Sequence, residues 1–258
     1  MNDQPIHSHR GLLHPTTLVL DAEYATLEPF MRSLPERFAR GEGEVIHQGR
    51  NELRIMTHEG LKLVVKSFCR PHLINRFVYG ILRPSKAKRS MENAVRLMQL
   101  GIGTPRPVGY YNERGVLGLA FKRSYFVTLC SECRYRYEHL FGPTIDYADE
   151  VLTAIGSLTA RLHEAQLAHK DYGRANILFD KKPDGTLLLE LVDLNRMHKG
   201  SLDMKAGCKN FERLPATPHM HRLMANAYAE ARGFDADECF RLMQAYRSVQ
   251  PGKIDDKY

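Results

Sequence analysis

Two polar side chains on one short segment carry the first chemical signal in this sequence. The segment HKDYGRANILFD begins at His169 after an amphipathic stretch and runs into an apolar one, so we expect a loop between a helix and a strand. Asp171 and Asn176 stand on this loop with four residues between them. A carboxylate there can orient or deprotonate an attacking hydroxyl, and an amide oxygen can hold a metal ion. Residues that merely cap or turn a chain have the same types, so this spacing alone is a weak signal.

A third oxygen ligand stands downstream. The apolar run LLLELV leads into Asp193, which comes seventeen residues after Asn176. A lone Asp at a strand end is usually a turn residue, but this one follows two other oxygen-bearing side chains on suitable elements. Mg²⁺ prefers hard oxygen ligands from one or two protein groups together with nucleotide phosphates. The three residues therefore favour phosphoryl transfer, a reaction catalysed mainly by positioning and by cations.

The N-terminal half holds residues suited to binding nucleotide phosphates. Lys66 follows the apolar residues LKLVV on the third expected strand, where it could neutralise the α- and β-phosphates of ATP. Glu92, on the helix expected next, could hold that lysine in place. The alternatives are a solvent-facing strand end for Lys66 and an exposed helix position for Glu92, but the order of the elements favours the functional interpretation.

The elements around these residues predict an α+β protein with two lobes. Alternating and apolar runs broken at 49–51 and 59–60 predict a three-stranded antiparallel meander over 44–68. The remaining expectations are a helix at 85–100, two strands within 103–129, a helix at 149–165, two strands around the turn at 183–185, and helices after 204. We thus expect an N-terminal extension at 1–40, an antiparallel-sheet N-lobe at 41–130 and a mainly helical C-lobe at 131–258.

In order and type, these elements resemble the protein-kinase-like superfamily. More narrowly, the chain resembles the bacterial lipopolysaccharide core kinases, the Kdo/heptose kinase family. The segments that carry the resemblance lie within about residues 40–215; they are VVKSF, SMENAVRLMQLGIGTPRPVGY, HKDYGRANILFD, VDLNRM and GCKNFERL. The chain departs from the superfamily pattern in three places. The glycine-rich loop that binds nucleotide phosphates is reduced to Gly49 and its neighbours, Lys170 stands before Asp171, and the metal segment reads DLN in place of DFG.

This resemblance implies an activity and roles for the site residues. It implies a two-lobed kinase fold, with ATP and Mg²⁺ as cofactors. The γ-phosphate would pass to a sugar hydroxyl of lipid A-core, at the cytoplasmic face of the inner membrane. By resemblance, Asp171 is the catalytic base, Asn176 and Asp193 are the magnesium ligands, and Lys66 is the phosphate-binding lysine.

Other functions compete with this one. A protein Ser/Thr kinase and an aminoglycoside- or choline-type phosphotransferase would use the same residues, and a pseudokinase would bind nucleotide without turnover. The short segment between Asp193 and the C-terminal helices leaves little room for a regulated activation loop, which favours a sugar or glycolipid acceptor over a protein. The intact set of Lys66, Asp171, Asn176 and Asp193 argues against a pseudokinase.

Composition limits the partners and the compartment. The 258-residue chain has a net charge of +7, which favours anionic partners. One stretch without acidic residues interleaves apolar side chains with Arg70, Arg76, Arg83, Lys86, Lys88 and Arg89. This pattern suits peripheral contact with anionic lipid, although a solvated basic face is as consistent with it. With no nucleic-acid motif, no signal-peptide layout and no apolar run of about 20 residues, we expect a cytoplasmic protein without a nucleic-acid partner.

Overall fold

The structure is a computed structural model that describes residues 16–68, 84–114, 121–143 and 145–247. Contacts divide the chain into two compact units. The first is Met1–Val95 with Pro105–Ser131, and the second is Arg96–Thr104 with Glu132–Tyr258. The change of unit at residue 131 lies beside the lobe boundary expected at residue 130. Each unit is described below by itself.

The first unit is built on a six-stranded antiparallel sheet with strand order β1-β5-β6-β4-β3-β2. The meander expected over 44–68 corresponds to β2 (Glu44–Gln48), β3 (Asn51–His58) and β4 (Leu61–Phe68). The two strands expected within 103–129 are β5 (Pro107–Arg114) and β6 (Phe121–Leu129). The sixth strand, β1 (Thr16–Leu20), pairs with β5 at one edge.

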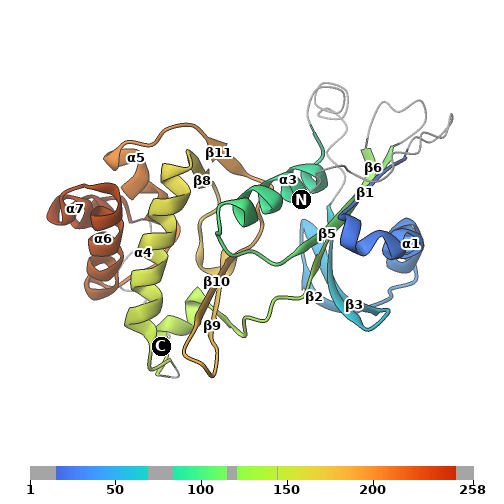
Figure 1. Ribbon diagram of the computed structural model, residues 1–258, viewed down its shortest axis with the longest axis horizontal. Helices are drawn as coiled ribbons and strands as arrows, with labels where there is room; N and C mark the ends of the chain where they lie inside the picture. The colour runs from blue at the N-terminus through green and yellow to red at the C-terminus, as the bar shows by residue number, and fades with distance from the viewer. Residues whose placement is uncertain (1–15, 69–83, 115–120, 144, 248–258) are drawn as a thin grey trace. The chain divides into compact units, whose positions relative to one another are not determined.

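Each face of this sheet is covered by one helix, as Figure 1 shows. Successive side chains on a strand point to opposite faces. On β4, Leu63 and Val65 join the buried cluster that includes α1 (Glu28–Ala39), whereas Phe68 packs with α3 (Lys86–Gln99) on the other face. Lys66 lies two residues before Phe68, so it shares the face that α3 covers.

Residues 16–39, expected as part of an N-terminal extension, belong to the first unit. They form β1, the 3₁₀ helix η1 (Ala22–Leu27) and α1, and Phe30, Met31 and Leu34 of α1 are fully buried in the core. Pro35 lies inside α1. Proline usually interrupts a helix, which explains why the sequence pattern did not predict this one.

Three helices of the second unit pack side by side (Figure 1). They are α4 (Ala148–Glu164), α6 (Pro218–Arg232) and α7 (Ala236–Tyr246). A methyl group on Gly156 of α4 would lie only 2.4 Å from the carbonyl oxygen of Met224 on α6, so glycine permits this close approach. Among the described helices, none combines the length and apolar character needed to span a bilayer.

Two small antiparallel sheets position the loops of the second unit. β9 (Ile177–Lys181) lies between β10 (Leu187–Leu191) and β7 (Tyr135–Arg136). β8 (Leu167–His169) pairs with β11 (Met197–Lys199), so the chain that leaves β8 starts beside the chain that enters β11. The remaining elements are η3 (Tyr137–Phe141), η4 (Arg174–Asn176), α5 (Met204–Lys209) and η5 (Asn210–Arg213).

Candidate active site

The loop between β8 and β9 is held at both ends and in the middle. At its start, the amide of Lys170 donates to the carbonyl of Arg196 at 3.0 Å and continues the β8–β11 ladder. At its centre, the fully buried Tyr172 places its hydroxyl 2.6 Å from that of Thr159 on α4. At its end, Asn176 Nδ2 donates to the carbonyl of Asp171 at 2.8 Å. The loop is therefore a rigid support for the side chain of Asp171.

Two arginines contact the carboxylate of Asp171. Arg196 Nη1 lies 3.0 Å and Arg213 Nη1 lies 2.8 Å from the same oxygen, Oδ1. The Asp171 side chain is 22% exposed, and those of Arg196 and Arg213 are 58% and 55% exposed. Within the described residues, the other oxygen, Oδ2, accepts no hydrogen bond. The arginines thus fix the orientation of the carboxylate through one of its two oxygens.

His169 joins the backbone of Asp171 to the segment that carries Asp193. The imidazole is fully buried, its Nδ1 accepts from the amide of Asp171 at 3.1 Å, and its Nε2 lies 3.0 Å from the carbonyl of Val192. Because an amide only donates and a carbonyl only accepts, the proton of a neutral ring belongs on Nε2. This one side chain therefore sets the spacing between the two acidic residues of the proposed site.

Asn176 and Asp193 are brought together by backbone pairing. The amide of Val192, next to Asp193, donates to the carbonyl of Asn176 at 3.1 Å. Asp193 has φ 61°, in the left-handed region that Asp tolerates better than most residues, so the chain turns sharply there. Its Oδ1 also accepts a short hydrogen bond from Nδ2 of the buried Asn195, which fixes the carboxylate.

These two residues fit a magnesium ion by the chemistry of their donors. Asn176 uses its amide nitrogen on Asp171, which leaves Oδ1 as its free coordinating atom, and Asp193 supplies carboxylate oxygens. Within the described residues, no group of three or more His, Cys, Asp or Glu side chains is arranged to hold a metal ion. A site with two oxygen ligands matches Mg²⁺, which takes its other ligands from nucleotide phosphates and water.

A chain of hydrogen bonds behind the loop connects it to α6. Tyr228 Oη lies 2.9 Å from Nδ1 of His163, whose Nε2 lies 3.0 Å from Oδ1 of Asn210. Asn210 Nδ2 then donates to the carbonyl of His169 at 2.9 Å. Each bond has one consistent direction if His163 is neutral with its proton on Nε2. Burial lowers the pKa of His163 to about 4, so the ring is neutral at physiological pH.

In the first unit, Lys66 and Glu92 occur on a shared face of the sheet. Lys66 is half-buried on β4, with Nζ 5.4 Å from the ring centroid of Phe68. Glu92 stands on α3, and its carboxylate forms an ion pair of 3.7 Å with Lys88. Burial and then the charge of Glu92 raise the pKa of Tyr110 on β5 to about 12, so Glu92 is near that face. A direct Lys66–Glu92 pair stays a prediction.

The remaining residues expected to bind partners fall partly outside the described chain. Gly49 lies in the tight turn between β2 and β3, as the sequence pattern predicts. Of the basic stretch, Arg70, Arg76 and Arg83 lie outside the described residues, whereas Lys86, Lys88 and Arg89 stand on α3.

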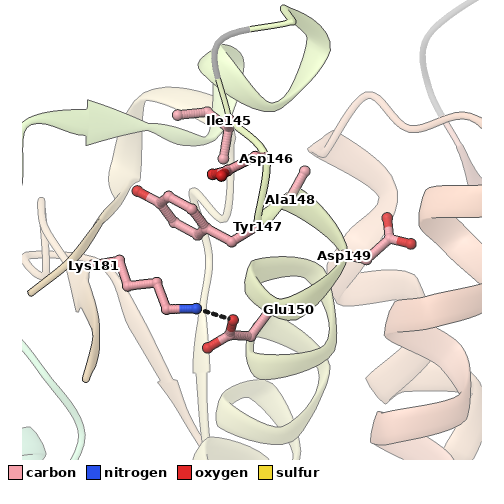
Figure 2. Close-up of a pocket in the computed structure, with 7 residues that line it drawn as sticks. All are labelled: Ile145, Asp146, Tyr147, Ala148, Asp149, Glu150 and Lys181. Atoms are coloured by element: carbon pink, nitrogen blue, oxygen red, sulfur yellow. Dashed lines mark hydrogen bonds and ion pairs between the residues drawn. The ribbon is translucent and has the colours of Figure 1, made fainter. Parts of the chain in front are cut away.

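A surface hollow in the second unit contains none of the expected site residues. Figure 2 shows its lining from the start of α4 and from Lys181 at the end of β9, with Lys181 Nζ 2.5 Å from the carboxylate of Glu150. Because β9 begins directly after Asn176 and spans about 13 Å, the hollow lies at the far end of that strand from the loop. Its acidic residues Asp146, Asp149 and Glu150 would repel the phosphates of a nucleotide.

Four residues of the site were not assigned a role from the sequence. Arg196 and Arg213 occur in the segments VDLNRM and GCKNFERL, which carried the resemblance, and Asn210 occurs in the second of them. His163 belongs to the face of the expected helix 149–165. Their partners lie 25 to 65 residues away along the chain, so no local spacing indicates the contacts.

Comparison with known proteins gives one family match and one curated relative. Residues 41–246 match the model of the lipopolysaccharide kinase (Kdo/WaaP) family. The curated relative is the 3-deoxy-D-manno-octulosonic acid kinase of Mannheimia succiniciproducens, with 29% identity over 124 residues. This alignment covers 47% of the present chain and 49% of the relative, so the chain spans about half the length of the curated relative it matches.

Among solved structures, WaaP in complex with acyl carrier protein is similar over almost the whole chain. The TM-score is 0.59 at 17% identity, and the match covers 93% of this chain and 99% of that one. The Rio2 kinase from Chaetomium thermophilum matches more weakly, at a TM-score of 0.47 and 16% identity, covering 96% of this chain and 83% of that one. The expected two-lobed, α+β protein-kinase-like fold is confirmed.

Proposed function

The chain belongs to the lipopolysaccharide kinase (Kdo/WaaP) family, and on that premise we propose that it phosphorylates a sugar of the lipopolysaccharide inner core. The reaction transfers the γ-phosphate of ATP to a hydroxyl of Kdo (3-deoxy-D-manno-octulosonic acid) or of heptose. The observation that carries this proposal is the hydrogen-bonded unit of Asp171, Asn176 and the segment of Asp193. Backbone and side-chain bonds connect all three within one region of the second unit.

Asp171 is proposed as the general base. Oδ1 is held by two arginines, so Oδ2 can accept the proton of the acceptor hydroxyl as that oxygen attacks phosphorus. A positioned base of this kind contributes about 10²- to 10⁴-fold to the rate. The half-buried position of the carboxylate keeps it accessible to a sugar that enters from solvent.

The nucleotide is proposed to bind through three residues and one turn. Asn176 Oδ1 and the Asp193 carboxylate would hold Mg²⁺, which neutralises the charge that develops on the phosphates. Lys66 would contact the α- and β-phosphates with its ammonium group, and Glu92 would orient it. The backbone at Gly49 would approach the phosphates closely, because this residue has no side chain.

The curated relative supports a Kdo-type acceptor. Its name specifies 3-deoxy-D-manno-octulosonic acid, and the present chain is 29% identical to it over the aligned 124 residues. A glycolipid that carries this sugar is therefore the first acceptor to test, with heptose-containing core as the second. Protein and soluble alcohol acceptors, together with nucleotide binding without turnover, become alternative outcomes of the same experiment.

The decisive test is transfer of label from γ-labelled ATP to purified lipid A-core in the presence of Mg²⁺. We expect label in the glycolipid, and a loss of at least about a hundredfold with Asp171→Ala. Asp184→Ala, in the exposed turn between β9 and β10, is the matched control and should retain activity. If nucleotide binds but no label reaches lipid, protein or small alcohols, the chain is a pseudokinase and the proposal fails.

Peripheral contact with the inner face of the inner membrane is a second part of the proposal. ATP is supplied on the cytoplasmic side, and the basic stretch that includes Arg76, Arg83 and Lys86 suits anionic headgroups. Charge reversal at these three positions should weaken binding to liposomes that contain anionic lipid. Unchanged liposome binding would remove this part and leave the kinase proposal intact.

A further inference from the structure

Two guanidinium groups contact the same carboxylate oxygen of the proposed base. Arg196 and Arg213 both contact Oδ1 of Asp171, at 3.0 and 2.8 Å, and together they exceed its single negative charge by one. One arginine would be enough to orient the carboxylate. The second guanidinium therefore needs a further explanation.

Both guanidinium groups have donors left for a ligand. A guanidinium carries five N–H donors in a planar fork. In the described part of the chain, each of these two arginines uses one nitrogen, Nη1, in its bond to Asp171. Both arginine side chains are more than half exposed, at 58% and 55%, so they are accessible to a ligand from solvent. The fork matches the geometry of a carboxylate or a phosphate.

We propose that Arg196 and Arg213 bind an oxyanion of the acceptor sugar and so place its neighbouring hydroxyl on Oδ2 of Asp171. This inference rests on the proposed kinase function and adds a specificity device to it. The chemical class recognised is a carboxylate or phosphate group carried by the sugar near the reacting hydroxyl. An acceptor without that group leaves the two cations partly unpaired and loses its orientation relative to the base.

The arrangement also explains why the arginines come from different segments. Arg196 directly precedes β11, and Arg213 ends η5, so the two side chains reach Asp171 from two separate segments of the chain. Gly173 lies near the backbone of Arg213, since a methyl group on it would be 3.9 Å from the Arg213 carbonyl oxygen. The loop that carries the base and the segment that carries Arg213 are therefore packed together, which fixes the distance between hydroxyl and oxyanion sites.

The test compares matched acceptors in the wild-type protein and in single variants. One acceptor is Kdo-bearing lipid A with a free carboxylate, the second has that carboxylate converted to its methyl amide, and the third has the lipid phosphates removed. We expect the wild type to favour the acceptor with the recognised oxyanion by about ten- to a hundredfold in kcat/KM, the range for a charge-assisted hydrogen bond. Arg196→Gln and Arg213→Gln should each reduce this preference towards one, while KM for ATP stays near the wild-type value.

The preference ratio separates recognition from simple positioning of Asp171. If the arginines only orient the carboxylate, the variants lose activity equally with all acceptors and the ratio stays as in the wild type, which overturns the inference. A wild type that prefers neither oxyanion also overturns it. If the wild type has a lower kcat/KM with the amide, the recognised group is the carboxylate. If it has a lower kcat/KM with the phosphate-free lipid, the recognised group is a phosphate.

Controls separate this inference from the kinase proposal. Arg241→Gln, a 72% exposed arginine on α7, should leave the preference ratio unchanged. Transfer by the wild type to any of the acceptors establishes the kinase function whatever the ratio. If no acceptor is phosphorylated, equilibrium binding of free Kdo, its amide and inorganic phosphate to the wild type and to Arg196→Gln still tests oxyanion recognition. Equal binding of Kdo and its amide, together with phosphate binding that the substitution does not change, refutes it.

Discussion

The backbone amide of Val192 donates a hydrogen bond to the carbonyl of Asn176 at 3.1 Å. This single bond sets the two proposed magnesium ligands beside each other, because Asp193 follows Val192 directly. His169 adds a second connection, from the Val192 carbonyl to the amide of Asp171. The proposed base and metal ligands are thus connected through backbone groups and the buried ring of His169.

Replacing the carboxylate of Asp193 tests the metal ligand. Asp193→Asn keeps the shape and removes the charge, so kinase activity at fixed Mg²⁺ should fall about a hundredfold or more. Asn195→Ala removes a hydrogen-bond donor to this carboxylate and should raise the Mg²⁺ concentration for half-maximal activity roughly tenfold. A magnesium titration of the initial rate measures both, and a wild-type titration curve for Asp193→Asn would exclude the assigned role.

The lysine on β4 can be tested against a neighbour on the same strand. Lys66→Ala should lower kcat/KM for ATP by about ten- to a hundredfold, because a charge-assisted contact to phosphate is lost. Lys62→Ala is the matched control, since Lys62 is an exposed residue on the same face of β4. Steady-state kinetics with varied ATP give the comparison. Equal effects of the two substitutions would mean that Lys66 acts only through general surface charge.

Asn210 connects two buried groups, so its removal should destabilise the second unit. Asn210→Ala leaves His163 Nε2–H and the His169 carbonyl without their partner, at a cost of about 1–3 kcal/mol in the free energy of unfolding. Activity should fall as well, because the loop that carries Asp171 loses one of its supports. Lys209→Ala, at the exposed neighbouring position, should change the unfolding free energy by less than about 0.5 kcal/mol. Denaturant unfolding measures both variants.

Buried neutral histidines predict lower stability in mild acid. Burial lowers the pKa of both His163 and His221 to about 4, whereas an unfolded histidine has its usual value of 6.5. Below pH 6.5 the unfolded state binds protons that the folded state does not, so stability is full above this pH and falls as the pH drops towards 4. When the pH falls from 7.5 to 5.5, each of these two histidines should lower the free energy of unfolding by about 1 kcal/mol.

Denaturant unfolding at these two pH values tests the histidine prediction. His221→Gln should reduce the pH-dependent loss by about 1 kcal/mol, while His47→Gln on the exposed strand β2 should leave it unchanged. A loss of the same size in all three proteins would assign the effect to other groups.

Local patterns predicted the elements that are continuous in sequence. The breaks at 49–51 and 59–60 predicted the meander β2–β4, and the apolar face of 149–165 predicted α4. Both signals are local, because turns and amphipathic periodicity depend on neighbouring residues. Residues 16–39 were different. β1 pairs with β5, about 90 residues away, and α1 contains Pro35, so neither element has a signal that local sequence can provide.

The residues of the candidate site also divide into those that local sequence indicates and those that it does not. Asp171, Asn176 and Asp193 were predicted from spacing, because the first two stand on a polar loop that leads into an apolar strand and the third ends the next apolar strand. Their roles stay predictions. The ion pairs of Asp171 with Arg196 and Arg213 bridge 25 and 42 residues, and they depend on how β11 and η5 fold back onto the loop. Such contacts follow from tertiary structure, and a surface arginine in a sequence carries no sign of its partner.

The hydrogen bonds behind the loop also decide where the proton of the acceptor hydroxyl can go. From Tyr228 to His163, Asn210 and His169, every bond has a fixed donor, and the last connection to Asp171 is a backbone amide. A peptide amide and an asparagine amide do not exchange protons on the timescale of turnover. These residues therefore support the loop mechanically and do not conduct protons away from Asp171. In the proposed mechanism, Asp171 therefore releases its proton directly from its own carboxylate after each transfer, to water or to the departing product.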